Sequence, residues 1–363
     1  MIEFVDVNRL PDPDTVWSEI VAASPTAWIW SSRSVHMFRV EYLVSAGQQY
    51  QDLSFVALEN GIPIGLAPVI VHSSQTGTRS RRDACYPGAP LPWPSLRAGQ
   101  ETDVEKRVLD EIERRVVEAG AEKIGLMLEA PGDTADLSLH FERMVRERGF
   151  VDSSFESHLV SVAPDFLPSI RPKYRQNIRK HRGSYDIMVL SGADISPEIV
   201  ERYMHLHVKD SGGQHRGPST YDKQFDILRL GEGFCVAAYR KGADRIVGML
   251  MIWSMKGAAY DASVAVDPEF QHESVSNLLK LEAIEEMARR GVGTYELGQA
   301  LSAPEYLSQP TEKNYGISFF KDGWSRGARR IVHVAEKYYD WKRLSADWQE
   351  KLESLTEHFR LQK

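Results

Sequence analysis

Residues 266–279, VDPEFQHESVSNLL, decide how the second half of this chain folds. The stretch begins as an apolar strand, turns at Pro268, and continues from Val275 with apolar residues at helical spacing. A helix that starts in this way leaves unpaired backbone N–H groups at its first turn, where proteins often bind anions. Serines occupy positions 274 and 276, where glycines would give a ligand more room. Two interpretations stay open: an anion cradle built with serine, or a serine that is an ordinary N-cap.

The pattern that leads into this stretch occurs twice in the chain. Residues 55–69 read FVALENGIPIGLAPV, and residues 236–250 contain VAAYRKG followed by RIVGML. Both predict an apolar strand, a polar turn ending in glycine, and a second apolar strand. Such self-similarity indicates a duplicated structural unit.

Each predicted hairpin is followed by an amphipathic helix and a further strand. Apolar residues recur every fourth position in both helices, which gives each helix one stripe that packs on a sheet. Gly120 and Gly291 end these helices, and the strands 124–128 and 294–297 follow. We therefore predict an α/β (α+β) fold with two similar domains, residues 1–165 and 166–337, and a closing helix in residues 338–363.

The composition narrows the class of protein. The chain has 363 residues, 42% of them hydrophobic, and a formal net charge of −7, which argues against a polycation that coats DNA or a membrane. Cys85 and Cys235 match no metal or redox spacing. The longest apolar run, residues 247–253, is too short for membrane insertion, and the N-terminus lacks the apolar core of a signal peptide. We expect a cytoplasmic protein; its oligomeric state is not indicated.

The turn at Gln271 resembles the GNAT superfamily of acyltransferases. In that superfamily a strand leads into a helix through Gln or Arg, two residues, Gly, any residue, then Gly or Ala. The resemblance implies that the first N–H groups of the helix bind the coenzyme A pyrophosphate. The residues to which this role would fall are Gln271, Ser274, Val275, Ser276 and Asn277.

The duplication narrows the resemblance to FemABX-type transferases and the related BioF2-like and CelD-like acyltransferases. Three further segments follow the order seen in that group: a basic stretch at 171–182, YELG at 295–298, and GISFFKDGW at 316–324. The resemblance implies two tandem GNAT-like domains, each a mixed, mostly antiparallel sheet flanked by helices. It places the active site in the C-terminal domain.

In that group, the lysine of the Phe-Lys element lies near the carbonyl that is attacked, which implies a catalytic role for Lys321 and a substrate contact for Phe320. A fixed cation there would stabilise the oxyanion of acyl transfer. The alternative is that Lys321 only complements a helix dipole. Glu296 and Asp261 are candidates to take the proton of an acceptor amine, and Tyr315 or Tyr260 could return one.

Basic residues elsewhere predict anionic substrate groups. Arg175 and Arg179 lie on one side of the predicted basic helix, and His215 and Arg216 lie in a Gly/Ser-rich loop. A solvated charged surface is the alternative for both. No metal site is predicted, because His205 and His207 point to different sides of their helix.

The leading hypothesis is an N-acyltransferase that moves an acyl group from acyl-CoA, most simply acetyl-CoA, to an amine of a small polar or phosphorylated acceptor. Such an acceptor could be an amino sugar, an amino acid or a cell-envelope precursor. The second hypothesis is a FemABX-like transferase with aminoacyl-tRNA as donor and tRNA as a partner. The third is a non-catalytic binding protein on a degenerate GNAT fold.

Overall fold

The computed structural model describes residues 1–76, 79–99, 103–129, 135–242, 245–301 and 310–361. The chain forms two compact units. Unit 1 consists mainly of Met1–Phe155 and Ile331–Lys363, and unit 2 consists of Glu156–Ser302 and Glu312–Arg330.

Unit 1 contains two groups of paired strands. One has the order β1-β3-β4-β8, and in the other β9 pairs with β17, β6 and β7. The strands of unit 1 are β1 (Ile2–Asp6), β2 (Tyr50–Asp52), β3 (Phe55–Glu59), β4 (Ile62–Ala67), β5 (Ile70–Thr76), β6 (Arg79–Ala84), β7 (Leu91–Pro92), β8 (Ser95–Leu96), β9 (Lys123–Leu128), β10 (Val151–Asp152) and β17 (Arg329–Tyr338). Its helices are α1 (Pro13–Ala23), α2 (Arg33–Ser45), α3 (Asp103–Glu118), α4 (Ala135–Arg148) and α10 (Trp341–Leu361).

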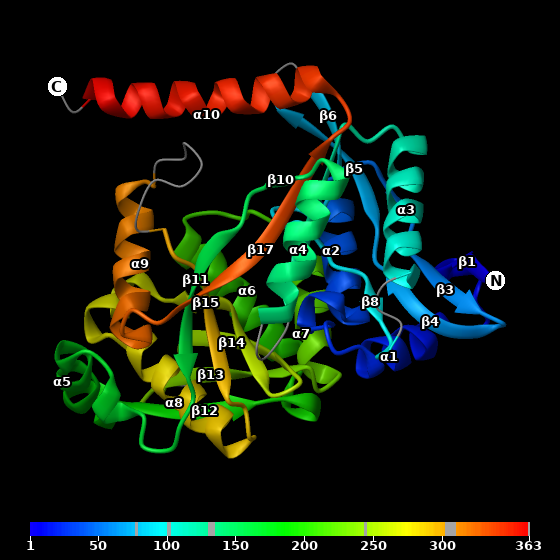
Figure 1. The fold of residues 1–363 in the computed structure, drawn as a ribbon. Helices are drawn as coiled ribbons and strands as arrows, with labels where there is room; N and C mark the ends of the chain where they lie inside the picture. The colour runs from blue at the N-terminus through cyan, green and yellow to red at the C-terminus, as the bar shows by residue number, and fades with distance from the viewer. Residues whose placement is uncertain (77–78, 100–102, 130–134, 243–244, 302–309, 362–363) are drawn as a thin grey trace. The chain divides into compact units, whose positions relative to one another are not determined.

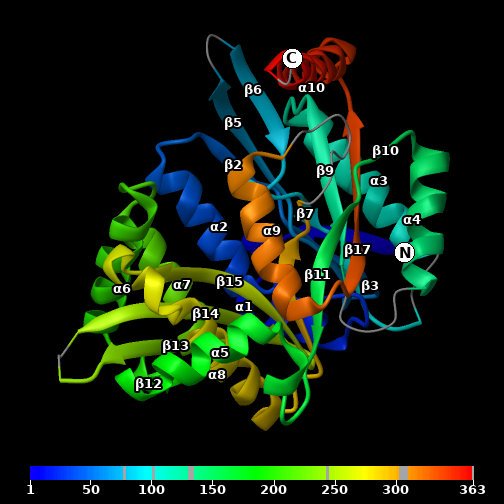
Figure 2. The ribbon, with the colours of Figure 1, turned by 90° about the vertical axis from the view of Figure 1, so that its left-hand side faces the viewer.

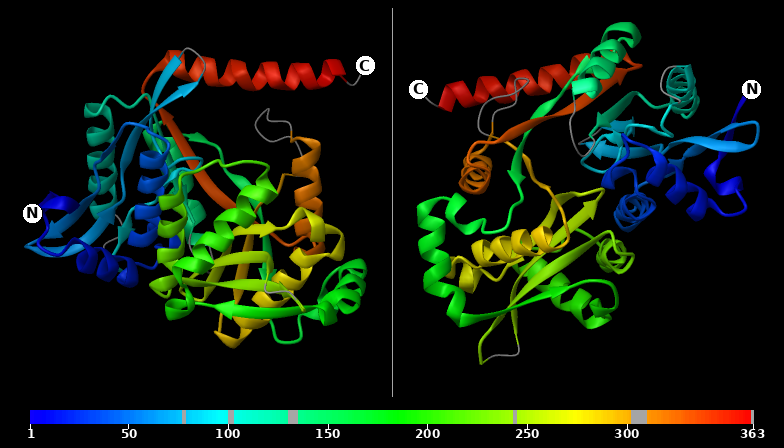
Figure 3. Two further views of the ribbon diagram at one scale, coloured as in Figure 1. Left: turned by 180° about the vertical axis from the view of Figure 1, so that it is seen from behind. Right: turned by 60° about the horizontal axis from the view of Figure 1, so that its bottom comes forward.

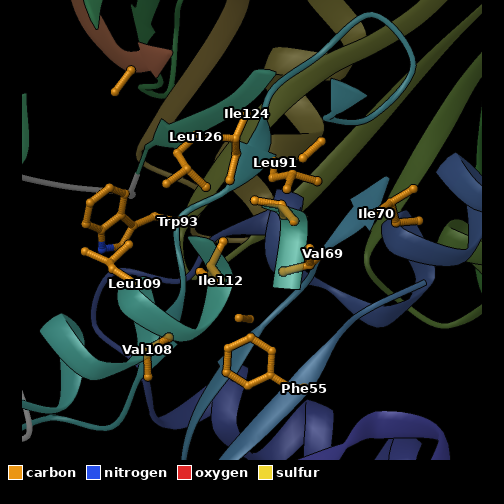
Figure 4. Close-up of a cluster of buried hydrophobic side chains, with 14 of the residues drawn as sticks. Phe55, Val69, Ile70, Leu91, Trp93, Val108, Leu109, Ile112, Ile124 and Leu126 are labelled. Atoms are coloured by element: carbon orange, nitrogen blue, oxygen red, sulfur yellow. The ribbon is translucent and has the colours of Figure 1, made fainter. Parts of the chain in front are cut away.

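The apolar stripe of α3 builds the core of unit 1. Val108 and Ile112 are buried on this helix and pack in one cluster with Phe55 of β3 and Ile124 of β9 (Figure 4). The four-residue spacing read from the sequence is therefore the buried face of α3.

Unit 2 is built on one continuous order of strands, β12-β13-β14-β15-β16-β11. Its strands are β11 (Phe155–Ser161), β12 (Tyr185–Leu190), β13 (Gly233–Arg240), β14 (Ile246–Met255), β15 (Ala258–Val266) and β16 (Thr294–Gln299). Its helices are α5 (Pro172–His181), α6 (Pro197–Ser211), α7 (Pro218–Arg229), α8 (Val275–Arg289) and α9 (Glu312–Ser325).

Helices cover both faces of this sheet. Phe234 and Val236 of β13 share a cluster with residues of α5 and α8. The intervening Cys235 is paired with Met251, which is paired with Ser263, and the hydroxyl of Ser263 contacts that of Tyr203 on α6. Successive residues of a strand point to opposite faces, so α5 and α8 lie on one face and α6 and α7 on the other (Figure 2). Gly248 of β14 lets α8 come close, because a Cβ there would lie 2.7 Å from Val275.

The two units repeat one order of elements, which confirms the predicted fold of two tandem domains. In unit 1 this order is strand β1, helices α1 and α2, the β3–β4 hairpin, helix α3, strand β9 and helix α4, with β2 and β5–β8 inserted between them. Strand β12, helices α6 and α7, the β13–β14 hairpin, helix α8, strand β16 and helix α9 follow in unit 2. In both units the first strand pairs antiparallel with the first strand of the hairpin.

The units are interleaved along the chain, a feature absent from the linear division predicted from the sequence. Strand β17 follows α9 of unit 2 but pairs with β9 of unit 1, and it runs beside β10 (Figure 1). Strand β11 follows the first half of the chain but pairs with β16 of unit 2. Each half therefore contributes its last strand to the sheet of the other, while residues 165 and 337 stay the predicted boundaries of the duplication.

Helix α10 is anchored to unit 1 by a buried arginine. Arg343 donates two hydrogen bonds to Asp83 at 2.9 and 3.0 Å and a third to Asp347 at 2.7 Å. These contacts join the start of α10 to the end of β6. Figure 3 shows α10 as the red helix in two further views. Among the described residues, no helix combines the length and apolar character required to cross a bilayer.

Candidate active site

The candidate site lies in unit 2, where strands β15 and β16 stop pairing. The two strands are parallel, and their register ends at the pair Tyr260↔Glu296. A bulge interrupts the pairing of β15 with β14 next to Asp261. Bulges re-aim side chains and are frequent beside active sites. The polar residues Tyr260, Asp261 and Glu296 are thereby gathered at one place in the sheet.

Two polar groups converge on Gly298, the residue at which β16 nears its end. A Cβ at Gly298 would lie 3.2 Å from Lys321 Nζ and 3.6 Å from the Tyr260 hydroxyl. Gly298 has a φ of +85°, which favours glycine, so the sequence signature YELG reflects both backbone conformation and space. Lys321 projects from α9 into this region. Burial lowers the pKa of its amino group and Lys280 adds to this effect, whereas Asp261 and Glu296 oppose it.

Asp261 is paired with a lysine that the sequence analysis did not single out. Lys280 Nζ, on α8, forms an ion pair with the Asp261 carboxylate and lies 3.1 Å from the hydroxyl of Tyr295. Only 5% of the Lys280 side chain is exposed. A signal was present in the sequence, because Lys280 interrupts an otherwise apolar run, but the functional reason for it lies in the contact with β15.

The Glu296 carboxylate also has hydrogen-bond and ion-pair partners. Its Oε1 accepts a hydrogen bond of 2.7 Å from Ser157, and its Oε2 pairs with Arg330. Glu296 is 3% exposed. Both carboxylate oxygens therefore have donors, which favours an electrostatic role for Glu296 over that of a free base.

A fully buried histidine lies beside this cluster. His158 of β11 lies between the hydroxyl groups of Ser318, at 3.1 Å, and Ser325, at 3.3 Å. Burial, followed by the charges of Arg329 and Lys321, lowers the pKa of His158 to about 3. His158 is therefore neutral at physiological pH, and no motif in the sequence pointed to it.

The anion turn predicted at residues 271–277 keeps the backbone that glycine would provide. Ser274 follows the short 3₁₀ helix η6 (Pro268–Glu273) and has φ 57° and ψ 37°, the left-handed conformation. Its hydroxyl accepts a hydrogen bond of 3.0 Å from Asn177 of α5, and its side chain does not cap α8. Asn277, 5% exposed, has a buried Oδ1 with no hydrogen-bond partner among the described residues. Ser274 therefore occupies the N-cap position of α8 without the side-chain hydrogen bond that an ordinary serine N-cap makes.

Carboxylates surround this turn. Glu273 accepts hydrogen bonds from Tyr185 at 2.7 Å and from Arg240 at 2.5 Å. Asp267 pairs with Lys209 at 2.8 Å, and the Gln271 side chain donates to Asp210 at 3.2 Å rather than lying free. The local charge is nearly balanced, in contrast to a strongly basic phosphate site.

Arg216 lies in the loop between α6 and α7, stacked at 4.1 Å over the ring of Tyr221. Its Nε and Nη2 atoms are buried and have no hydrogen-bond partner among the described residues. The neighbouring His207 accepts from or donates to the Tyr221 hydroxyl at 3.1 Å, and its pKa is lowered to about 4 by burial and then by Arg216. His215 is exposed, with its ring 3.4 Å from the Ser211 carbonyl. Arg216 is therefore partly buried, whereas His215 is exposed.

The arginines of the basic segment, residues 171–182, differ in their surroundings. Arg175 donates to the carbonyl groups of Pro168 and Ile170 and lines a cavity of about 580 Å³ together with Arg171 and Arg326. Arg179 is exposed. The predicted ridge of arginines on one face of α5 is therefore only partly free for a ligand.

The remaining predicted residues lie on α9. Phe320 is partly buried, and its ring lies 5.5 Å from that of Tyr174. Tyr315 precedes Lys321 by six residues, which places the two side chains on different sides of the helix. Tyr260, rather than Tyr315, is the tyrosine beside Lys321. Among the described residues, no cluster of side chains suited to a metal ion is found.

Comparisons with known proteins agree with this fold. Residues 168–306 match the family model described as an acetyltransferase (GNAT) domain. FemX has the same fold, with a TM-score of 0.67 at 10% identity, over 95% of this chain and 100% of its own. L-PGS from Bacillus licheniformis has a TM-score of 0.57 at 13% identity, over 94% of this chain and 97% of its own.

A tandem GNAT protein from the clavulanic acid biosynthesis pathway has a TM-score of 0.50 at 12% identity, over 93% of this chain and 98% of its own. No protein of curated function matches the sequence. The resemblance to GNAT proteins that the sequence suggested is confirmed. Residues 168–306 thus match the model of the GNAT acetyltransferase domain, within a chain that has the fold of FemX.

Proposed function

We propose that this protein is an N-acyltransferase whose reaction takes place in unit 2, beside Gly298. The observation that carries the proposal is the convergence of the Lys321 amino group and the Tyr260 hydroxyl on one point at the end of β16. An ammonium group and a hydroxyl at a strand end are suited to a reaction in which negative charge develops on a carbonyl oxygen.

In the proposed reaction the acceptor amine attacks the carbonyl carbon of the acyl donor. The new C–N bond forms a tetrahedral oxyanion, and the Lys321 ammonium would stabilise its charge. The bond to the donor's sulfur or oxygen then breaks. Tyr260 could return a proton to the leaving group, because its hydroxyl lies beside Lys321. The amine would attack in its neutral form, having lost its ammonium proton to water, and the proton that its nitrogen loses after attack would reach the leaving group through the Tyr260 hydroxyl. Asp261 and Glu296, both paired with cations, would shape the electrostatic field at the site.

An acyl-CoA such as acetyl-CoA is the first candidate donor. The left-handed Ser274 keeps the chain path of a glycine turn, and the buried, unpartnered Oδ1 of Asn277 lies in the first turn of α8. The N–H groups of Val275 and Ser276 would bind the pyrophosphate, and Gln271 would have to leave Asp210 to take part.

Aminoacyl-tRNA is the second candidate donor. Two observations favour aminoacyl-tRNA over coenzyme A. The Asn177 amide already donates a hydrogen bond to the Ser274 hydroxyl, and carboxylates surround the turn at residues 271–277. The cavity lined by Arg171, Arg175 and Arg326 offers a separate basic surface for phosphates.

Calorimetry with coenzyme A separates the two donors. Micromolar binding that a Ser274→Trp substitution abolishes would support acyl-CoA. No coenzyme A binding, together with tRNA binding that weakens steeply as salt rises, would support aminoacyl-tRNA. A chain that binds neither would leave the non-catalytic binding protein.

The acceptor is proposed to carry a carboxylate or phosphate as well as the amine. Nε and Nη2 lie on one edge of the planar guanidinium and form a fork that matches two oxygens of such a group. In Arg216 both atoms are buried without a partner among the described residues, and stacking on Tyr221 fixes the plane.

Variants at two positions test the proposed roles together. Lys321→Ala should keep the fold and lower kcat at least tenfold, because one donor to an oxyanion is worth roughly 10²–10³ in rate. Arg216→Gln should raise KM for the acceptor while changing kcat little, because it contacts the acceptor away from the carbonyl. Unchanged turnover in Lys321→Ala would remove that residue from the mechanism.

A further inference from the structure

One carboxylate in unit 2 lies between two lysines of different helices. Asp261 forms an ion pair with Lys280 of α8 and also exerts an electrostatic effect on Lys321 of α9. Asp261 does not contact the two lysines equally. Among the described residues, Lys280 has the direct contact with Asp261, and no carboxylate lies within 4.0 Å of Lys321 Nζ.

Lys280 is held by two buried partners rather than one. Its ammonium contacts the Asp261 carboxylate and, at 3.1 Å, the hydroxyl of Tyr295, a residue with no exposed surface. Burial and then Asp261 raise the pKa of Tyr295 well above its usual value, so this hydroxyl stays protonated. The three groups form a closed polar cluster between α8, β15 and β16.

A helix that packs on a sheet does not need a lysine at this position. Leu279 and Leu281, its neighbours in the sequence, are buried apolar residues, and an apolar side chain of similar length would fill the same space. Replacing a buried ion pair by apolar residues is often neutral or stabilising. Packing alone therefore does not explain why position 280 is a lysine, and we look for the reason in its charge.

Among the residues that the structure describes, every charged group that acts on Lys321 is either committed elsewhere or of the same sign. Asp261 on β15 is taken by Lys280, and Glu296 on β16 is taken by Arg330 and Ser157. Lys280 on α8 repels Lys321. His158 on β11 is neutral, and Tyr260 on β15 is the remaining polar neighbour.

We propose that Lys280 is a positioning residue of the candidate active site. It holds Asp261 on the α8 side and so leaves the Lys321 amino group unpaired and directed at Gly298. Without Lys280, Asp261 would become the partner of Lys321, and the ammonium would be drawn from the position at which the oxyanion is expected. The inference rests on the proposed role of Lys321, but its test does not require the reaction.

The test measures the protonation of Lys321 directly. Intact protein is labelled with trace acetic anhydride between pH 6 and 11, and the labelling rate of Lys321 is determined by mass spectrometry. Lys173, which is exposed on α5, serves as the internal reference. Wild type, Lys280→Met, Lys280→Arg and Asp261→Asn are compared, with circular dichroism to confirm the fold.

Substitutions of Lys280 and of Asp261 are expected to change the labelling rate of Lys321 in opposite directions. In Lys280→Met the released Asp261 and the loss of the Lys280 charge both favour the charged form of Lys321, so labelling at pH 8 should fall at least threefold. In Asp261→Asn that attraction is lost, so labelling should rise. Lys280→Arg should behave as wild type, because it keeps the cation.

Equal labelling of Lys321 in folded Lys280→Met and wild type would overturn the proposal, as would shifts of the same sign in Lys280→Met and Asp261→Asn. If Lys280→Met does not fold, the comparison of Asp261→Asn with Lys280→Arg still decides: a fall in labelling in Asp261→Asn would refute it. If the shifts occur but Lys321→Ala retains full turnover, only the proposed function fails.

Discussion

Gly323 on α9 is the position at which a single methyl group tests how the candidate site is held. A Cβ at Gly323 would lie 2.1 Å from Cε2, 2.7 Å from Cζ and 2.8 Å from the hydroxyl oxygen of Tyr174 on α5. The ring cannot easily move, because it is buried and its hydroxyl donates to the Phe320 carbonyl at 3.3 Å. Gly323→Ala therefore forces α5 and α9 apart, two residues from Lys321.

The change in the free energy of unfolding of Gly323→Ala follows from two opposing effects. Inserting a methyl group into a packed contact costs about 1–3 kcal/mol, and the distance of 2.1 Å argues for the upper end. Replacing glycine by alanine within a helix returns about 1 kcal/mol. The free energy of unfolding should therefore fall by about 2 kcal/mol, on the balance of these two effects.

Gly316 provides a matched control on the same helix. It is exposed, and a Cβ there meets nothing within 4 Å, so Gly316→Ala should raise the free energy of unfolding by about 1 kcal/mol through helix propensity alone. Urea unfolding followed by circular dichroism and by tryptophan fluorescence measures both variants. The contact between α5 and α9 would be refuted if Gly323→Ala were as stable as Gly316→Ala.

Two further predictions concern buried charge. The pKa of His158 in the folded protein is about 3, below its usual value of 6.5. The unfolded chain alone therefore takes up this proton, and stability is lost as pH falls from 6.5 towards 3. In His158→Gln the urea midpoint should fall less between pH 7 and 4.5, whereas a variant at an exposed histidine, His205→Gln, should follow wild type. Glu296→Gln removes the buried carboxylate that pairs with Arg330 and should cost about 3–5 kcal/mol in urea unfolding. The double variant Glu296→Gln/Arg330→Gln should lose less than the sum of the single variants, and additive losses would show that the pair is not coupled.

Local periodicity was enough to predict the elements that build the candidate site. The apolar spacing of α3 and α8, the two hairpins and the glycines that end both helices depend on neighbours in the chain, and all appear in the structure. The order of motifs around Lys321 also pointed to the place at which it meets Gly298.

The state of the polar residues could not be predicted in this way. Asp261 and Glu296 looked like free carboxylates until the fold paired them with Lys280 and Arg330. Ser274 looked like an N-cap or a cradle, and only the folded backbone showed its left-handed conformation with Asn177 on its hydroxyl. Partners far apart in sequence are chosen by packing, which no local pattern records.

The sequence by itself determined which segments are strands and helices and that the set occurs twice, because hydrophobic periodicity is a property of each segment. Only the tertiary structure decided which sheet each last strand joins. An alternating strand such as β17 can satisfy its backbone hydrogen bonds on either sheet edge, so its pairing with β9 is set by the whole fold. The same holds for charge. The sequence determines which residues carry it, but the contacts of α8 with β15 and β16 decide that Asp261 pairs with Lys280, the pairing proposed to leave Lys321 unpaired.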